Sequence, residues 1–363
     1  MIPIYQPFLH DDCLRHVHDA LDSGWISSQG KYVREAEAKL EGILGAKHVC
    51  LVNNGTAATH LVAKGLLFKH PNIKKLFVPN NVYVAAWNSF CYDNQLELVP
   101  IDADLDTWNV DIEKLKEQIE EDCAVLIVHN VGNIINVPDL KRELPESTVF
   151  VEDNCEGFMG MYNGRFSGTQ SLISSLSFFG NKTITCGEGG AVVTDDTQLF
   201  DHIRKIKGQG QSEQRYVHDV LGYNYRMTNV QAAILLGQLE SLDQILARKD
   251  EIFSTYRDHF SHVEGVHAQE LEAGTMHSNW MMGVRIEGNQ SYEYIRDFLY
   301  NKGVDSRPMF YPMSKHNHLK KFSKGQEVVA SKLNKECVLL PSYPGLSKSQ
   351  CMTVIEAVKE YVR

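Results

Sequence analysis

The sequence lacks the features that place a protein in a membrane, in a secretory pathway or around a metal ion. Its longest purely apolar runs, such as 124–128, are far shorter than the ~20 residues of a membrane-spanning helix. Its first residues show no basic stretch followed by an apolar core, as a secretory signal would. The 8 cysteines include no CxxC pair, and the 15 histidines no HExxH motif. We therefore expect reduced thiols, a cytoplasmic location and no metal ion.

Positive charge is also scarce. Lys and Arg number 36 against 46 Asp and Glu, which gives a net charge of −10. Proteins that bind nucleic acid polymers or an anionic membrane surface normally carry an excess of basic residues, so both classes are disfavoured. Hydrophobic residues make up 43% of the chain and charged residues 23%, as in ordinary globular proteins. An anionic ligand must therefore be held by a few local groups against the overall charge.

The length of 363 residues corresponds to about two domains, and the chain contains no internal repeat. Up to about residue 195, short apolar runs alternate with helical patterns, which is typical of a largely parallel sheet with helices on both faces. Ligands of such sheets bind beyond the carboxyl ends of the strands. We expect strands at 48–52, 75–79, 96–102, 124–130, 148–154, 174–179 and 190–194, and helices at 56–67, 84–92 and 112–120.

The pattern changes after Thr228. Apolar residues recur at steps of three and four from Asn229 to about Phe260, which predicts one long helix with a possible break near 248–250. The remainder mixes helices with short strands, and no linker rich in Pro, Gly or Ser marks a boundary. We expect an α/β protein with a large, mostly parallel-sheet domain at 1–248 and a smaller C-terminal α+β domain at 249–363.

The first segment with a chemical signal is NNGTAA at 53–58, where an expected strand ends and a helix begins. Free N–H groups and the positive end of the helix dipole make such a junction an anion site. Gly55 allows a phosphate to approach closely, and Thr56 can cap the helix and donate its hydroxyl. Taken alone, an ordinary capped turn is the better explanation of this segment.

Two further segments carry reactive side chains. Asp153 ends an expected strand at the ligand-binding edge, although capping of a following helix would explain it alone. Lys182 lies between two expected strands and before a GEGG turn, so it is either a surface hairpin lysine or an amine nucleophile. Together, a phosphate site, a carboxylate and a lysine supply what pyridoxal phosphate needs: a phosphate cup, a partner for the pyridine nitrogen and an amine that captures the aldehyde.

Six motifs extend this reading over nearly the whole chain: GWISSQG at 24–30, NGTAA at 54–58, SFFGNK at 177–182, GEGG at 187–190, GYNYRMT at 222–228 and LPSYP at 340–344. Together they resemble the DegT/DnrJ/EryC1/StrS sugar aminotransferases, a family of fold-type I pyridoxal-phosphate enzymes. The lysine segment with GEGG and the GYNYRMT segment are the most specific. The resemblance implies pyridoxal 5'-phosphate as cofactor, pyridoxamine phosphate as its amino form, and a homodimer with shared active sites.

The resemblance also implies residue roles. Lys182 resembles the lysine that bonds to the cofactor and shuttles the proton, and Asp153 the carboxylate that keeps the pyridine nitrogen protonated. Tyr83 stands where an aromatic residue often stacks on the cofactor ring, and Asn224 resembles an asparagine that reaches the phosphate in the other subunit. The expected cofactor contacts are Gly55, Thr56, Ala57, Tyr83, Asp153, Glu156, Ser177, Lys182 and Asn224. The expected substrate contacts are Trp25, Ser27, Asn181, Tyr223, Arg226, Arg307 and Tyr311.

Some positions depart from the usual family pattern. Glu156 stands where a histidine or glutamine is common, and it resembles the perosamine-synthase-like branch, which aminates C4 of a 4-keto-6-deoxy sugar. Residues 303–312 are similar to a substrate-binding segment of that branch, in which Arg307 would meet the nucleotide diphosphate; a surface ion pair is the equal alternative for Arg307. For Asn224 and Arg226, a capped helix start is compatible with the functional role. Cys186 and the Asn53–Asn54 pair also depart from the pattern, which affects only fine geometry.

The resemblance implies a nucleotide-sugar 4-aminotransferase. We expect it to convert a UDP- or dTDP-linked 4-keto-6-deoxy-D-glucose to the viosamine-type 4-amino-4,6-dideoxy sugar, with L-glutamate as amino donor and 2-oxoglutarate as by-product. The alternatives are a GDP-perosamine synthase, a sugar 3-aminotransferase and a catalytically silent regulator. Deoxysugar dehydration is disfavoured, because the dehydratase branch of the family lacks the lysine that corresponds to Lys182.

Overall fold

A computed structural model describes residues 1–323, 325 and 327–363 of the chain. Its main sheet contains β1 (His48–Val52), β2 (Lys75–Pro79), β3 (Glu97–Ile101), β4 (Ala124–Val128), β5 (Val149–Asp153), β8 (Ser174–Ser177) and β9 (Gly190–Thr194). The strand order is β1-β9-β8-β5-β4-β2-β3, and β9 alone runs antiparallel to its two neighbours. The predicted, largely parallel sheet is therefore confirmed, although several strands end earlier than expected. β4, for example, stops at Val128, before the short 3-10 helix η1 (Asn130–Gly132).

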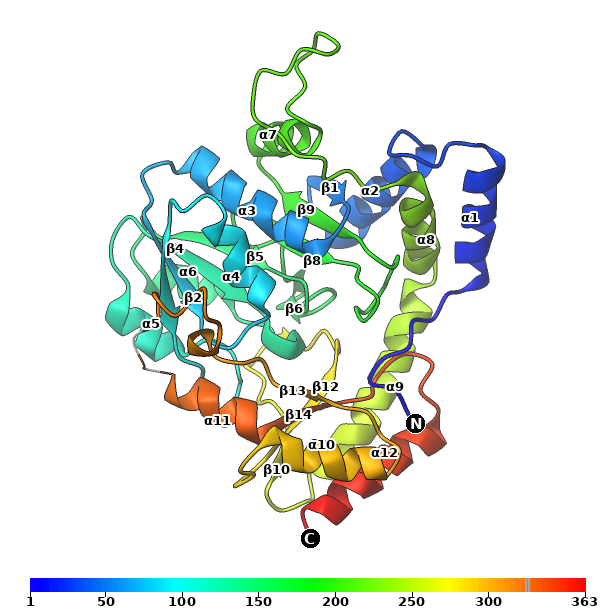
Figure 1. Cartoon of the computed structure of the whole chain (residues 1–363), viewed down its shortest axis with the longest axis vertical. Helices are drawn as coiled ribbons and strands as arrows, with labels where there is room; N and C mark the ends of the chain where they lie inside the picture. The colour runs from blue at the N-terminus through cyan, green and yellow to red at the C-terminus, as the bar shows by residue number, and fades with distance from the viewer. Residues whose placement is uncertain (324, 326) are drawn as a thin grey trace.

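Helices cover both faces of this sheet (Figure 1). Because side chains alternate along a strand, Leu76 and Val78 of β2 pack in one core and Phe77 in another on the opposite face. The first core includes α3 (Gly55–Lys69), α4 (Val84–Cys91) and α7 (Thr197–Lys207). The opposite face is covered by α5 (Ile112–Gln118) and α6 (Val137–Glu143), and, beside β1 and β9, by α1 (Asp11–Asp22), α2 (Lys31–Leu44) and α8 (Asn229–Glu240). Across the described ranges, no helix combines the length and apolar character needed to cross a membrane.

The long helix expected after Thr228 is divided at a different point from the one predicted. α8 ends at Glu240 and α9 (Leu242–Phe260) follows it, with Ser241 between them at φ −98° and ψ 10°. The break expected near 248–250 is wrong, since these residues lie inside α9. These three residues are charged, but the side chain of Lys249 is buried and bonded to backbone carbonyl groups, so the helix continues through them.

The C-terminal part builds a second, antiparallel sheet in the order β10-β12-β14-β13. Its strands are β10 (Val266–His267), β12 (Met282–Ile286), β14 (Cys337–Leu340) and β13 (Arg307–Pro308). The helices of this part are α10 (Tyr292–Asn301), the 3-10 helix η2 (Met313–Lys315), α11 (Val328–Glu336) and α12 (Lys348–Tyr361). A small sheet of β11 (Thr275–Met276), β6 (Met161–Tyr162) and β7 (Arg165–Phe166) joins segments from both halves of the chain.

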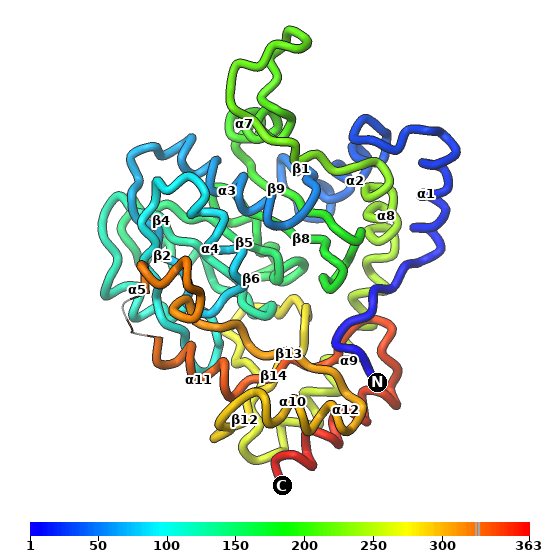
Figure 2. Tube along the Cα trace, viewed as in Figure 1, coloured from blue at the N-terminus to red at the C-terminus, as the bar shows by residue number. Residues whose placement is uncertain are grey.

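The first residues pack with this C-terminal part (Figure 2). The N–H of Ile2 donates to the carbonyl of Gly303 at 2.7 Å, and the N–H of Asp305 donates back to the carbonyl of Ile2 at 2.9 Å. The expected boundary at 248–249 falls inside the continuous helix α9. We propose that α9 bridges the two domains and that both chain ends contribute to the smaller one.

Buried hydrogen bonds join the two parts. Asp102, directly after β3, accepts hydrogen bonds from the N–H groups of Val329 and Ala330 at 3.0 and 2.9 Å, and so caps α11. Asn80, directly after β2, accepts one from the N–H of Met313 at 2.8 Å. These bonds fix the C-terminal part against the carboxyl edge of the main sheet, where ligands of such sheets bind.

Candidate active site

A cavity of about 860 Å³ lies at this edge, between the main sheet and the C-terminal part. Most of the predicted site residues line it: Gly55, Thr56, Ala57, Tyr83, Asp153, Glu156, Ser177, Asn181, Lys182, Arg307 and Tyr311. They come from α3, the cap of α4, the ends of β5 and β8 with the loops that follow them, and β13 with the segment after it. The fold therefore brings together residues that are more than 250 positions apart in the sequence.

The first wall of the cavity is the N-terminus of α3. The helix begins at Gly55, and its cap is Asn54, whose side-chain oxygen accepts from the N–H of Ala57 at 2.8 Å, rather than the expected Thr56. A Cβ atom at Gly55 would lie 2.8 Å from the Cβ and Oγ atoms of Ser177, so only glycine fits this close approach. The N-terminus of α3, Thr56 and Ser177 thus line the same end of the cavity, and such a set of N–H and hydroxyl groups suits a phosphate.

The second wall carries Asp153, the last residue of β5. The carboxylate is buried and accepts a hydrogen bond from the N–H of Cys155 at 3.1 Å. It caps no helix, because the chain continues through turns after Asn154. An anionic group in this position can hold a protonated pyridine nitrogen.

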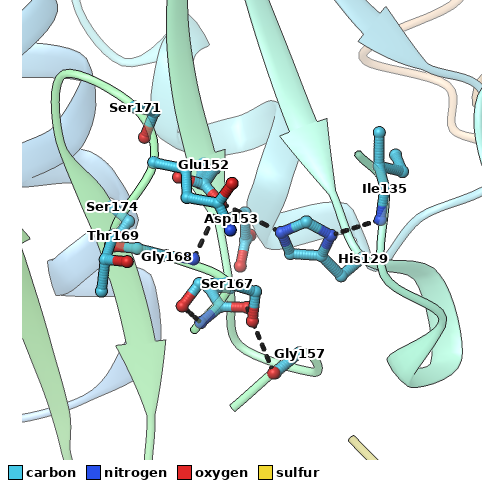
Figure 3. Close-up of polar contacts among 12 residues, drawn as sticks. His129, Ile135, Glu152, Asp153, Gly157, Ser167, Gly168, Thr169, Ser171 and Ser174 are labelled. Atoms are coloured by element: carbon cyan, nitrogen blue, oxygen red, sulfur yellow. Dashed lines mark hydrogen bonds and ion pairs between the residues drawn. The ribbon is translucent and has the colours of Figure 1, made fainter. Parts of the chain in front are cut away.

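A buried polar network supports the β5 end from behind (Figure 3). Oε1 of Glu152 lies 3.1 Å from Nε2 of His129 and accepts from the N–H of Gly168 at 2.8 Å. Nδ1 of His129 accepts from the N–H of Ile135 at 3.1 Å, which assigns the ring proton to Nε2. Burial raises the pKa of Glu152, but the hydrogen bonds from His129 and Gly168 outweigh it and hold the pKa below its usual value. No sequence motif pointed to His129.

Lys182 lies in the tight loop after β8, where its N–H donates to the carbonyl of Phe179 at 2.9 Å. It lines the cavity, so it is not a surface hairpin lysine. Its Nζ atom lies 4.2 Å from the centroid of the Trp280 ring. The amine therefore faces the same space as the phosphate cup and Asp153.

Glu156 is buried in the cavity wall, and its Oε2 atom accepts from the N–H of Val131 at 2.8 Å. Burial raises the pKa of Glu156 to about 7; Asp153 acts in the same direction, and Lys182 and the Val131 N–H oppose it. Val131 has a φ of +58°, which is unfavourable for a β-branched residue and costs about 1–3 kcal/mol. The surrounding structure thus keeps a strained backbone that presents its N–H to Glu156.

The remaining wall consists of exposed aromatic and basic side chains. The ring centroids of Tyr83 and Phe310 are 6.1 Å apart, and Tyr311 lies next in the chain. Arg307 forms an ion pair with Asp305 at 2.6 Å and also lines the cavity. The ion pair and a place in the substrate cavity were predicted as alternatives for this residue, and the structure shows both.

Five predicted site residues do not line the cavity of this chain: Trp25, Ser27, Tyr223, Asn224 and Arg226. Trp25 is 61% exposed. The side chain of Asn224 accepts a hydrogen bond from Nε of Arg226 at 3.0 Å. The Tyr223 ring stacks on Tyr225, which does line the cavity. The walls described above are therefore formed without these five residues.

Sequence reasoning missed Trp280 and His60, which both line the cavity. His60 follows the phosphate cup by one helical turn of α3, and its Nδ1 atom lies 3.0 Å from the Tyr225 hydroxyl. Helical spacing from Thr56 could have indicated His60. No local signal could have indicated Trp280, because it reaches the site through contacts between distant segments.

A parallel-sheet α/β domain with a phosphate cup, a buried carboxylate at a strand end and a lysine in one cavity is the arrangement of fold-type I pyridoxal-phosphate enzymes. The residues fit this cofactor: the glycine-only cradle admits a phosphate, and the carboxylate and amine match its ring nitrogen and aldehyde. The sequence matches the DegT/DnrJ/EryC1/StrS aminotransferase family over residues 8–359, and the chain belongs to this family. It is a pyridoxal-phosphate-dependent aminotransferase.

Individual relatives are similar over almost their full length. The chain is 35% identical to a GDP-perosamine synthase of Escherichia coli O157:H7, covering 99% of this chain and 98% of the relative. It is 34% identical to a GDP-perosamine synthase of Vibrio cholerae, covering 99% of each. Among solved structures, the aminotransferase TlmJ from Streptoalloteichus hindustanus superposes with a TM-score of 0.91 at 25% identity, covering 100% of this chain and 99% of that one.

Proposed function

We propose that this aminotransferase acts at C4 of a GDP-linked 4-keto-6-deoxy-D-mannose and forms the GDP-linked 4-amino-4,6-dideoxy sugar, GDP-perosamine. The similarity to GDP-perosamine synthases over 99% of the chain carries this proposal. It favours the mannose-configured, GDP-linked product over the viosamine-type product with a UDP or dTDP carrier that we expected first. Glu156, which resembles the same branch, supports this choice.

The residues of the cavity take the following roles in the proposal. Pyridoxal phosphate, when bound, supplies an aldehyde that exchanges amines and a protonated ring that accepts an electron pair. The Asp153 carboxylate holds the ring nitrogen protonated. The Lys182 Nζ atom takes the α-proton from the amino donor, for which we propose L-glutamate, and in the second half-reaction gives a proton to C4 of the sugar.

In this proposal the nucleotide sugar binds to the exposed wall of the cavity, which carries Tyr83, Tyr311 and Arg307. Arg307 offers a cation to the diphosphate, and Tyr83 and Tyr311 offer aromatic and hydroxyl contacts. The net charge of −10 makes such local groups necessary, because the substrate is itself an anion. Neutralisation of Arg307 should therefore weaken binding of the nucleotide sugar more than that of the amino donor.

We also propose a homodimer in which Asn224 completes the phosphate cup of the other subunit. Two observations support it: Asn224 lies outside the cavity of its own chain, and large apolar side chains such as Trp25 (61% exposed) and Leu221 (83% exposed) lie on the surface. Mixed dimers test this arrangement. A mixture of the Lys182→Ala and Asn224→Ala variants should regain about a quarter of wild-type activity, because only mixed dimers hold one intact site.

The substrate proposal is tested with glutamate and a panel of GDP-, UDP- and dTDP-linked 4-keto-6-deoxysugars, with the amino sugar identified by mass spectrometry and NMR. We expect the highest kcat/KM with the GDP-linked mannose-configured sugar and amination at C4. A preference for a UDP- or dTDP-linked glucose-configured sugar would instead support the viosamine type. Amination at C3 would overturn the proposed position of the reaction.

A further inference from the structure

Lys249 is a buried lysine without a carboxylate partner. It lies in the middle of α9 and is 0% exposed. Within the part of the chain that the structure describes, no carboxylate contributes to the pKa of Lys249, on which burial alone acts. Instead, Nζ donates to the carbonyl of Trp280 at 3.0 Å and to that of Ser342 at 2.9 Å. Burial lowers the pKa of Lys249 to about 7, and a neutral amine has two N–H groups for these two acceptors.

Trp280, which Lys249 holds by its carbonyl group, also contacts the Lys182 loop. Its indole N–H donates to the carbonyl of Asn181 at 2.9 Å. The centroid of its ring lies 4.2 Å from Lys182 Nζ, within the range of a cation–π interaction. One side chain therefore holds both the backbone before Lys182 and the reactive end of Lys182.

Tyr5 holds the same loop from the N-terminal segment. Its hydroxyl donates to the carbonyl of Lys182 at 2.5 Å. Burial raises the pKa of Tyr5, so the hydroxyl remains a donor over the whole physiological pH range. The Tyr5 ring centroid lies 5.8 Å from Lys249 Nζ, which connects this contact to the same buried lysine.

We propose that Tyr5, Trp280 and Lys249 form a clasp that positions Lys182 for reaction with the cofactor. The three residues come from the N-terminal segment, from the residues before β12 and from α9, whereas Lys182 belongs to the main-sheet domain. The clasp fixes the carbonyl groups of Asn181 and Lys182 and limits the space that Nζ can explore. The three residues are positioning residues, and the inference rests on the proposed role of Lys182 as the residue that bonds to the cofactor.

The test separates the placement of Lys182 from the integrity of the cofactor site. Cofactor-free enzyme is mixed with pyridoxal phosphate, and the rate of covalent capture by Lys182 is followed by absorbance. The affinity for pyridoxamine phosphate is measured in parallel, because this form has no aldehyde and does not bond to Lys182. Trp280→Leu, which removes a hydrogen bond and the ring, should slow capture about 10-fold, and Tyr5→Phe about 2- to 10-fold. The affinity for pyridoxamine phosphate should stay within about twofold of wild type in Tyr5→Phe, because Tyr5 does not line the cavity.

Matched controls remove the same chemical groups elsewhere. The indole N–H of Trp87 donates to the carbonyl of Pro79 at 2.9 Å, and the Tyr256 hydroxyl donates to that of Pro341 at 2.7 Å. Trp87→Leu and Tyr256→Phe should leave the capture rate unchanged. Unchanged capture in Trp280→Leu and Tyr5→Phe, or a parallel loss of pyridoxamine phosphate affinity in Tyr5→Phe, would overturn the proposal.

A third variant tests Lys249 itself, and Tyr5→Phe covers the case in which that variant does not fold. Lys249→Met keeps the volume of the side chain but leaves the Trp280 carbonyl without its donor, so we expect slower capture there too. If that variant does not fold, Tyr5→Phe, which loses a single hydroxyl, still tests the clasp. None of these measurements needs a sugar substrate, so failure of the proposed sugar specificity would leave the result on the clasp intact.

Discussion

The phosphate cup and the clasp serve the same cavity but are built in different ways. The cup is mostly a local structure, since a single strand–helix junction supplies Asn54, Gly55 and Thr56, and the end of β8 adds Ser177. The clasp joins segments that are up to 275 positions apart, from Tyr5 to Trp280. A local site depends on few contacts elsewhere, whereas the clasp depends on the docking of the C-terminal part.

Each region also has a lysine that is shielded from solvent, partly for Lys207 and fully for Lys249, and the two lysines differ. Lys207 donates to the carbonyl of Leu51 in β1, the strand that leads into the cup, and lies 3.5 Å from the Glu37 carboxylate. Burial opposes its charge, but Cys50 and Glu37 outweigh the burial and raise the pKa of Lys207. Lys249 has only carbonyl partners, and its pKa falls to about 7. A nearby carboxylate thus decides whether a buried lysine keeps its charge.

The largest expected effect distinguishes the role of Lys182 in turnover from the role of the phosphate cup in binding. Lys182→Ala should lose at least ~10³-fold in turnover, because the variant has no amine to move the proton. It should still bind pyridoxamine phosphate, because the cup and Asp153 are unchanged. Steady-state kinetics and equilibrium binding check both expectations, and a variant with normal turnover would refute the assigned role of Lys182.

The second-largest expected effect is the loss of cofactor affinity caused by a substitution in the phosphate cup. Gly55→Ala would place a Cβ atom 2.8 Å from Ser177, so we expect affinity for the cofactor to fall on the order of 100-fold. Gly42→Ala is the control, because a Cβ atom at Gly42 in α2 meets nothing within 4 Å. That change should leave cofactor binding intact and stabilise α2 by about 0.5–1 kcal/mol. Fluorescence titration and thermal melts measure the two effects.

The docking of the C-terminal part gives the third prediction. Asp102→Ala should reduce the free energy of unfolding by about 2–4 kcal/mol, because buried N–H groups of Val329 and Ala330 would lose their acceptor. Asp111→Ala, which removes the cap of α5 within the main-sheet domain, should cost only about 1 kcal/mol. Urea unfolding of both variants provides the comparison. Equal losses of unfolding free energy in the two variants would show that the hydrogen bonds of Asp102 across the two parts stabilise the protein no more than an ordinary helix cap.

The smallest effect per step is the change in stability for each pH unit, which concerns Lys249 and Lys207. In the unfolded chain Lys249 titrates near 10.5, and in the folded protein near 7, so between these values the unfolded state binds the extra proton. Through this group, stability rises with pH by up to ~1.4 kcal/mol per unit between pH 7 and 10.5, and is constant below pH 7. Lys249→Met should remove this rise. Lys207→Met should not, because the pKa of Lys207 is raised. Urea unfolding at several pH values measures the slopes.

Most of the main-sheet domain could be predicted from the sequence. Strands such as β1 and β9 are short apolar runs bounded by turn residues, so their ends were predicted to the residue. Ser241 was missed as the break between α8 and α9, because the apolar spacing continues on both sides of it. The break predicted near Lys249 does not occur, and charge in a sequence does not reveal that this side chain has buried carbonyl partners.

The cofactor chemistry could be inferred from local sequence, because the order of the phosphate-binding turn, Asp153 and Lys182 is set by short motifs and strand ends. The family membership followed from the same motifs. The residues that hold Lys182 in place, and the way the C-terminal part closes the cavity, could be identified only in the folded protein. Tyr5, Trp280 and Asp102 act through contacts between distant segments, and no local pattern encodes such contacts, because they arise from the packing of whole elements.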